Sequence, residues 1–585
     1  MKLLFPILSL LAPTAWAEKP NIVIFLADDA GWGDYSHSGN TQLSTPHIDS
    51  IAKEGASLEN FFVCPLCAPT RAEFLTGRYY PRTGVSGVST GHERLNLDEK
   101  TIADAFKAAG YATGAFGKWH NGSQFPYHPC GRGFDEYFGH TSGHWGEYFD
   151  APLEDNGRMV KTEGYIVDVC TDKAISFIER KKDGPFFCYI PFTTPHSPWA
   201  APKGYWEKFK DMPITQTGTN AKRQNIDETR CAYAMMENQD WNVGRVLRKL
   251  DELKLSENTI VIYFSDNGPN GNRWTGGLKG TKGGTDEGSV KSVCYMRFPG
   301  KIRSGKSIMP IAGAIDLLPT LTGFAGIQRV GDKPLDGRDL TPLLTGAGVE
   351  WPERKIFSAW PQKVSVRTQA HRLDAQGNLF NMTTDPGQTT VLNKEEPQLA
   401  AELSQAALRW KEEVFQDRIT TRGDLDARPI PIGHREFPIT MLPARDGIPS
   451  GGIKRSGAAP NCSYFINWTS TEGKMTWPAD VHTAGRYRVS IDYTCPPGDA
   501  GSTIRLSFKD ASLTGKVEPA WDPPVKTDQD TVPRHPMESQ MKDFKTLNLG
   551  EIILAAGDGD LILSAMEMPG KSVMEVRRVT LTLME

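Results

Sequence analysis

Asn21-Ile22-Val23-Ile24-Phe25-Leu26-Ala27 runs directly into Asp28-Asp29, and this stretch decides the fold. A continuous apolar run of this length, rich in β-branched residues, is typical of a strand that is buried on both faces, as in a parallel sheet. The two aspartates come where the strand ends. Ligand sites in parallel sheets form beyond the carboxyl ends of the strands, so we expect the carboxylate pair at such an edge.

Three further apolar runs, at residues 112–116, 185–190 and 259–264, have the composition of buried strands. Helical patterns such as residues 229–253 alternate with them, which predicts an α/β fold with a mostly parallel sheet. Polar residues follow each of these strands as well, namely Lys118-Trp119-His120, Thr193-Thr194-Pro195-His196 and Asp266-Asn267. We therefore expect four separate segments to converge on one cleft.

A cysteine motif precedes a predicted helix: Cys67-Ala68-Pro69-Thr70-Arg71, continuing to Leu75-Thr76-Gly77-Arg78. Pro69 suits the first turn of a helix, and Arg71 would lie one turn in, near exposed amides and the positive end of the helix dipole. For the pattern C-x-P-x-R alone, a buried structural cysteine is an equally good interpretation.

Oxygen ligands gather at two of the strand ends. Asp28, Asp29, Asp266 and Asn267 are three carboxylates and an amide, which favours a hard cation, calcium before magnesium, over zinc. Taken singly, the Asp-Asp pair could cap a helix and Asp-Asn-Gly could form a turn. Their shared place at the sheet edge favours the metal site.

The stretch from Cys67 to Arg78 resembles the signature of the type I, formylglycine-dependent sulfatases. The resemblance covers roughly residues 20–390. It includes Asp28-Asp29 with Gly31-Trp32-Gly33, Gly117-Lys118-Trp119-His120, Thr194-Pro195-His196, Asp266-Asn267-Gly268, and Gly280-Thr281-Lys282 leading to Glu287-Gly288. It implies an alkaline-phosphatase-like α/β fold, a mostly parallel sheet flanked by helices, with a smaller α+β subdomain after it.

The resemblance also implies a modified nucleophile at Cys67. A formylglycine-generating or radical maturase enzyme would oxidise this cysteine to formylglycine (3-oxoalanine), whose hydrate attacks the sulfate in line. Collapse to the aldehyde then releases sulfate, an exit that a serine sulfate would lack. The implied cofactor is Ca²⁺, held by Asp28, Asp29, modified Cys67, Asp266 and Asn267.

Further roles follow from the resemblance. Arg71 and Lys118 would hold the hydrate and the sulfate, and Lys282 would bind sulfate and assist the leaving oxygen, because cations stabilise the charge of the transition state. His120 would take the proton of the second hydroxyl, and His196 would be the general acid at the leaving oxygen. Alone, each could be a turn histidine or a surface lysine. Thr70 stands where serine is commoner in the family.

Two loops rich in aromatic and polar groups are predicted near the cleft, His144-Trp145-Gly146-Glu147-Tyr148 and Asn270-Gly271-Asn272-Arg273-Trp274. We expect His144, Trp145, Arg273 and Trp274 to contact a sugar ring. The alternative is that the tryptophans only pack the loops.

The domain prediction has five parts. Residues 1–17, with Lys2, an apolar run and Ala15-Trp16-Ala17, are a predicted signal peptide, which implies a secreted or periplasmic protein. A catalytic domain follows over residues 18–300, then a subdomain over 301–420, a linker over 421–450, and a β-sandwich over 451–585. Carbohydrate binding by the sandwich is the minority interpretation.

Composition limits the partners. The net charge of −4, with both signs interspersed, argues against nucleic-acid binding, and no apolar stretch beyond the predicted signal peptide has the length of a membrane span. Nine cysteines show no zinc-ligand spacing and leave any disulfide pairing open.

The prediction is thus a sulfuric ester hydrolase that removes O-sulfate from a sulfated polysaccharide or oligosaccharide. One alternative is a phosphate or phosphonate monoester hydrolase of the same superfamily. Another is an exported glycan-binding protein without activity. The sugar and the position of its sulfate stay open.

Overall fold

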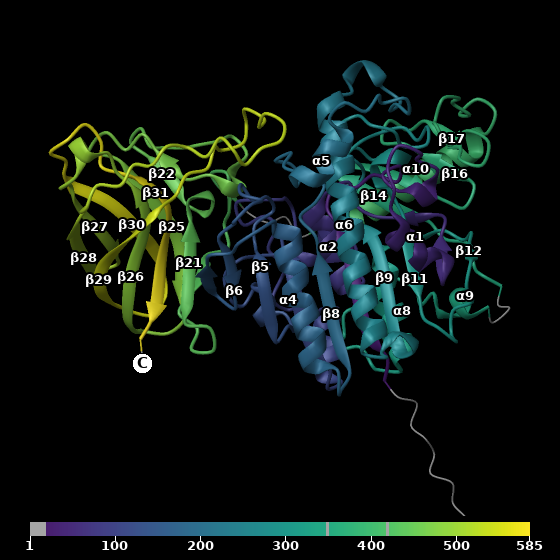
Figure 1. The fold of residues 1–585 in the computed structure, drawn as a ribbon, viewed down its shortest axis with the longest axis horizontal. Helices are drawn as coiled ribbons and strands as arrows, with labels where there is room; N and C mark the ends of the chain where they lie inside the picture. Colours follow the sequence, from purple (N-terminus) through teal and green to yellow (C-terminus); the bar gives the residue numbers. More distant parts are fainter. Residues whose placement is uncertain (1–18, 347–349, 417–420, 585) are drawn as a thin grey trace, which may run out of the picture.

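The computed structural model describes residues 19–346, 350–416 and 421–584. Figure 1 shows an α/β body, which contains most of the chain, beside a C-terminal β-sandwich. The predicted signal peptide, residues 1–17, lies outside the described residues. The α/β class expected from the sequence is confirmed.

A ten-stranded sheet forms the centre of the α/β body. Its five middle strands are parallel, and antiparallel pairs flank them on both sides. The strand order is β12 (Lys306–Ile308), β2 (Ala56–Leu58), β11 (Cys294–Arg297), β9 (Thr259–Ser265), β1 (Asn21–Ala27), β8 (Phe186–Pro191), β4 (Ala112–Lys118), β5 (Glu136–His140), β6 (Leu153–Asp155) and β7 (Arg158–Val160).

Both faces of the central sheet are buried, which explains the unbroken apolar run of β1. Successive side chains of a strand point to opposite faces. Val23 and Phe25 therefore pack in one hydrophobic core, and Ile22 and Ile24 pack in the other.

Helices cover these two cores. On one face lie α1 (Pro46–Lys53), α4 (Ile166–Lys181), α5 (Lys203–Phe209) and α6 (Ile226–Glu252). On the other lie α2 (Cys67–Thr76), α3 (Ile102–Ala108), α8 (Leu317–Ala325) and α9 (Thr341–Thr345). The helix predicted from the periodicity of residues 229–253 is α6.

The α/β body continues past residue 300, where the sequence analysis placed a domain boundary. β12 joins the central sheet, and α8 packs on it. A small sheet of β10 (Lys291–Ser292), β3 (Phe61–Phe62) and β13 (Ala312–Gly313) spans the same boundary, after the short α7 (Glu287–Val290). The change of sequence texture near residue 300 therefore reflects shorter elements, and the predicted boundary is wrong.

The smaller subdomain is an antiparallel four-stranded sheet with one helix packed on it. Its elements are β14 (Ile356–Trp360), β15 (Lys363–Arg367), β16 (His371–Leu373), β17 (Leu379–Asn381) and α10 (Pro397–Val414).

The C-terminal domain consists of two sheets around one hydrophobic core. One sheet contains β20 (Ile430–Ile432), β22 (Ile448–Ser450), β25 (Lys474–Val481), β27 (Thr503–Phe508), β28 (Ala511–Lys516) and β30 (Gly557–Glu567). The other contains β21 (Ile439–Pro443), β23 (Lys454–Arg455), β24 (Phe465–Ile466), β26 (Gly485–Thr494), β29 (Lys545–Leu554) and β31 (Glu575–Leu583). The predicted β-sandwich is present.

The segment predicted as a linker, residues 421–450, is instead structured. It begins with the pair β18 (Thr421–Arg422) and β19 (Leu425–Asp426), and it contributes β20, β21 and β22 to the sandwich. Its prolines misled the prediction, because proline is tolerated in edge strands: Pro431 lies in β20 and Pro449 in β22.

All nine cysteines lie within the described ranges and are free thiols. Cys188, in β8, is fully buried in the core, as its apolar surroundings in the sequence predict. Within the described ranges, every helix is too short or too polar to cross a membrane.

Glu73 gives the fold a testable pH dependence. This residue is buried in α2, and burial raises the pKa of its carboxyl from 4.5 to about 8. Between these values the unfolded chain has lost the proton that the folded chain retains, so this group makes stability fall as pH rises. Each unit of pKa difference corresponds to about 1.4 kcal/mol.

We expect Glu73→Gln to abolish this contribution. The melting temperature of the variant should gain on that of the wild type progressively from about pH 5 to pH 8, the interval between the two pKa values. Thermal scans of both proteins across this range measure the gain. The contributions of the other buried acids to the pH dependence cancel in this difference, because both proteins contain them. A pH-independent difference would contradict the prediction.

Candidate active site

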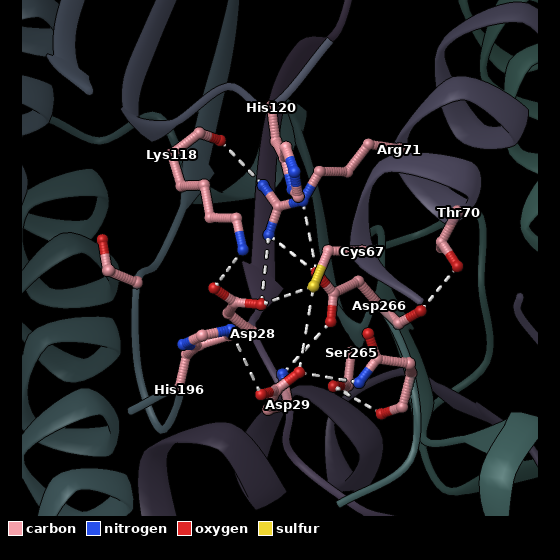
Figure 2. Close-up of polar contacts among 12 residues, drawn as sticks. Asp28, Asp29, Cys67, Thr70, Arg71, Lys118, His120, His196, Ser265 and Asp266 are labelled. Carbon is pink, nitrogen blue, oxygen red and sulfur yellow. Dashed lines mark hydrogen bonds and ion pairs between the residues drawn. The ribbon is translucent and has the colours of Figure 1, made fainter. Parts of the chain in front are cut away.

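The carboxyl ends of the parallel strands meet at one edge, as predicted. Asp28 and Asp29 follow β1, Asp266 and Asn267 follow β9, and Lys118 is the last residue of β4. His196 comes five residues after the end of β8. Figure 2 shows Asp28, Asp29, Lys118, His196 and Asp266 gathered around Cys67.

Cys67 is the first residue of α2, preceded by Leu66 in an extended conformation. Its Sγ lies 3.2 Å from Asp28 Oδ1 and 3.9 Å from Asp29 Oδ1. Burial, followed by the charges of Asp266 and Asp28, raises the pKa of the thiol well above its ordinary value. An unmodified Cys67 would therefore be a protonated, poor nucleophile at neutral pH.

The start of α2 is held in place by its neighbours. Thr70 Oγ1 donates to the carbonyl of Asp266 at 2.5 Å and accepts from the backbone N–H of Cys64 at 2.8 Å. Asn121 Nδ2 donates to the carbonyl of Ala68 at 3.2 Å. The hydroxyl of Thr70 thus joins the cysteine motif to Asp266, the residue that follows β9. No motif in the sequence indicates this role for Asn121, because it depends on a contact with a distant segment of the chain.

Three cations neutralise the buried carboxylates. Lys118 Nζ lies 2.6 Å from Asp28 Oδ2, and Lys282 Nζ lies 2.8 Å from Asp29. Arg71 pairs with Asp266 Oδ2 at 2.8 Å, and Figure 2 shows it above the cysteine. Burial would raise the pKa of Asp29, but the charges of Lys282, His196 and Lys118 lower it below its usual range. Buried charges persist only with such compensation.

The residues present fit a divalent cation. Ligand atoms of Asp28, Asp29, Cys67 and His196 all lie within 4.8 Å of one another. Asn267 donates its Nδ2 to Asp29 at 2.8 Å, while its buried Oδ1 has no hydrogen-bond partner among the described residues. A buried amide oxygen without a donor is costly, and a hard cation would satisfy it.

Asp266 is turned partly away from this cluster. One of its oxygens pairs with Arg71, and the other accepts from the backbone N–H of Asp29 at 3.1 Å. Burial, followed by the charge of Asp28, raises the pKa of Asp266 to about 6. A cation beside it would favour the ionised form.

Two histidines complete the centre. His120 has a positive φ of 65°, a conformation that costs energy outside glycine and that Asp29 shares with a φ of 68°. His120 Nε2 lies 2.8 Å from the carbonyl of Val88, and its buried Nδ1 is unpartnered within the described part of the chain.

His196 faces the carboxylate cluster through one nitrogen. Its Nδ1 lies 2.6 Å from the carbonyl of Ser197, which can only accept, so Nδ1 carries a hydrogen and Nε2 is left facing Asp29 Oδ2 at 3.6 Å. Burial, followed by the charge of Lys282, lowers the pKa of His196 to about 4.

The four predicted sugar contacts have different surroundings. His144 is buried with its ring 5.4 Å from that of His196. Trp145 stacks on His140 at 5.2 Å with the Arg577 guanidinium 5.6 Å from its ring, so it packs between the two domains. Trp274 packs against Trp32, with ring centroids 6.4 Å apart.

Arg273 corrects one of these predictions. Its side chain is buried and pairs with Asp34, with its NH2 group 2.6 Å from Asp34 Oδ2. The same NH2 group donates to the carbonyl of Asp29 at 2.7 Å. Arg273 therefore supports the strained turn at Asp29 instead of contacting a sugar. Asp34, its partner 239 positions away in the sequence, was not foreseen.

Comparisons with known proteins show which family the chain is similar to. The family model described as Sulfatase matches residues 20–327. N-acetylgalactosamine-6-sulfatase of Canis lupus familiaris is 31% identical over 378 residues, which cover 58% of this chain and 68% of that protein. Steryl-sulfatase of Mus musculus is 29% identical over 437 residues, which cover 57% of this chain and 66% of that protein.

Solved structures share the fold. The crystal structure of Ps i-CgsB in complex with k-i-k-neocarrahexaose has a TM-score of 0.61 and 27% identity, covering 67% of this chain and 93% of that chain. Phosphonate monoester hydrolase of Agrobacterium radiobacter, with a TM-score of 0.52 and 19% identity, covers 70% of this chain and all of its own, and shows the fold alone. The family match spans more than half of the chain and contains the cluster around Cys67, so the chain belongs to the sulfatase family.

Proposed function

We propose that this sulfuric ester hydrolase removes an O-sulfate from a sulfated carbohydrate. The observation that carries the proposal is the set of three cations, Arg71, Lys118 and Lys282, around buried Cys67, next to loops with polar side chains. The named substrate of N-acetylgalactosamine-6-sulfatase and the oligosaccharide bound to Ps i-CgsB support a sugar as the leaving group.

The family implies a metal ion and formylglycine, and we propose Ca²⁺ and Cys67 for them. Oxidised and hydrated, position 67 would supply the attacking oxygen. The cation, held by Asp28, Asp29, Asp266 and Asn267, would polarise that oxygen and neutralise the carboxylates. A maturase enzyme and export through the predicted signal peptide are part of the proposal.

The chain's own cations would hold the sulfate. Lys118 and Lys282 now neutralise Asp28 and Asp29, at 2.6 and 2.8 Å. With a divalent cation paired to those carboxylates, both ammonium groups would be available to the oxygens of the sulfate. Fixed charges in a buried site stabilise the charge that develops during the displacement without reorganising.

His196 is our proposed general acid. Its neutral state in the substrate-free site follows from burial and from Lys282. A sulfate ester adds negative charge beside it, which raises the pKa and favours the protonated form. His120, with its unpartnered buried Nδ1, is the proposed base that restores position 67 after transfer.

The function is tested with purified protein matured in a host that modifies Cys67. We expect sulfate release from at least one member of a panel of galactose 6-sulfate, N-acetylgalactosamine sulfates and carrageenan oligosaccharides, measured by ion chromatography. Matched phosphate monoesters test the phosphatase alternative. Faster release of phosphate than of sulfate would contradict the proposal.

Cys67→Ala should abolish turnover, because alanine cannot be oxidised to an aldehyde hydrate, and Cys67→Ser should do the same in a host whose maturase oxidises cysteine only. Mass spectrometry of the wild type should show formylglycine at position 67. Circular dichroism and melting temperature should remain close to those of the wild type, since the site cations remain paired. Turnover by either variant without formylglycine at position 67 would rule out the aldehyde mechanism. Cys188→Ala, which alters a buried cysteine of the core, is the matched control.

His196→Ala should separate substrates by their leaving groups. We expect kcat to fall about 100-fold or more on a sugar sulfate, whose alkoxide needs a proton, and much less on 4-nitrophenyl sulfate. Steady-state kinetics on both substrates measure the difference. Equal losses would contradict the general-acid role.

Asn267→Ala should weaken calcium binding about tenfold or more, at least the loss seen on removing groups that merely support a metal ligand. Asn267→Asp should retain binding, because it keeps an oxygen at this position. Calorimetric titration of chelator-treated protein with Ca²⁺ measures both, with Asn272→Ala in the same loop as control. Unchanged affinity in Asn267→Ala would remove this residue from the ligand set.

A further inference from the structure

A segment of the sandwich packs against the loops that carry His144 and His196. Residues 517–544, here called the arm, connect β28 to β29. Figure 1 shows the sandwich sending loops toward the α/β body. In the arm, the backbone N–H groups of Thr531 and Val532 donate to the carbonyl of Trp199 at 2.8 and 3.1 Å. Val532 is buried in the core on one face of the central sheet.

The arm is also anchored to the loop that carries His144. Arg534 donates to the carbonyl of Gly146 at 2.7 Å and pairs with Asp530 of the arm. Lys526 lies 2.8 Å from the buried Glu147. These contacts join the arm to both loops that border His196.

Glu538 is the arm residue that reaches the site. Its Oε1 accepts from Ser197 Oγ at 2.6 Å. Its Oε2 lies 3.7 Å from Nε2 of His144, too far for a hydrogen bond. Both of these atoms are buried and without a hydrogen-bond partner among the residues that the structure describes.

The position of this pair matters for the reaction. Ser197 follows His196 directly, and the ring of His144 lies 5.4 Å from that of His196. Glu538 and His144 thus border the residue proposed as the general acid. Two buried polar atoms that face each other without bonding leave an acceptor and an imidazole nitrogen for a ligand.

We propose that Glu538, supplied by the sandwich, accepts a hydrogen bond from a hydroxyl of the leaving sugar and thereby determines specificity together with His144. The inference rests on the proposed function. A carboxylate only accepts, and its bonds with hydroxyl groups are strong. The same negative charge would repel a second sulfate at that position, so the pair selects a free hydroxyl there.

The test compares Glu538→Ala, Glu538→Gln and the control Asp528→Asn, which alters an exposed carboxylate of the same arm. On the sugar sulfate that the wild type hydrolyses fastest in the panel above, kcat/KM of Glu538→Ala should fall about 10- to 100-fold, the range for a lost hydrogen bond to a charged group. On 4-nitrophenyl sulfate, which lacks the hydroxyl, the change should stay within about threefold. Glu538→Gln should lie between, because its amide oxygen still accepts.

Binding gives a second measurement that needs no turnover. In the Cys67→Ala background, Glu538→Ala should weaken calorimetric affinity for the same sugar sulfate by a similar factor, while Asp528→Asn leaves it unchanged. Equal losses on both substrates would show that Glu538 only maintains the loops around His196. Unchanged kinetics on both would also overturn the inference. A wild type inactive on every sulfated sugar would instead overturn the proposed function, and this role with it.

Discussion

Three buried carboxylates at the ends of two adjacent strands are the constraint on which the rest of the site depends. Asp28, Asp29 and Asp266 are fully buried, and isolated ions at such positions would be very unfavourable. The chain compensates them with Arg71, Lys118 and Lys282, each within hydrogen-bonding distance of a carboxylate. Cys67 lies between these groups because it is the first residue of α2, and α2 begins at this edge of the sheet.

This arrangement of charges serves the reaction more than it stabilises the fold. Buried ion pairs seldom outweigh the cost of removing their charges from water. The positive φ values of Asp29 and His120 add strain at the same place. Arg273 and Asp34 support the turn at Asp29, and Asn121 ties α2 to the sheet edge. The molecule thus maintains an unfavourable concentration of charge where sulfate chemistry requires fixed cations.

Much of this was predictable, because strand ends in a parallel sheet share an edge. The apolar runs and the residues after them placed Asp28, Lys118 and Asp266 together before any contact was known. Contacts between distant segments were not predictable. Arg273 pairs with Asp34, 239 positions away, and so it supports the backbone, although its loop suggested a sugar contact.

The predicted linker over residues 421–450 was wrong for a related reason. The short, proline-containing strands β20 and β22 have no periodicity that would indicate a sheet, and only pairing with β25 makes them strands. Composition alone therefore assigned them to a linker. Segments whose structure depends on a partner elsewhere in the chain carry little local signal.

The same reasoning separates the two sides of the active site. The side of the site proposed to hold the sulfate is built mainly from residues that follow strands, so short sequence motifs indicate its chemistry. The leaving-group side is built where the loops of His144 and His196 meet the arm, and the bond between Ser197 and Glu538 joins residues 341 positions apart. Reaction class can therefore be inferred from sequence, whereas the specificity role that we propose for Glu538 depends on how the sandwich docks. A sulfatase body without this domain would keep its charged centre and lose the arm that contacts the loops of His144 and His196.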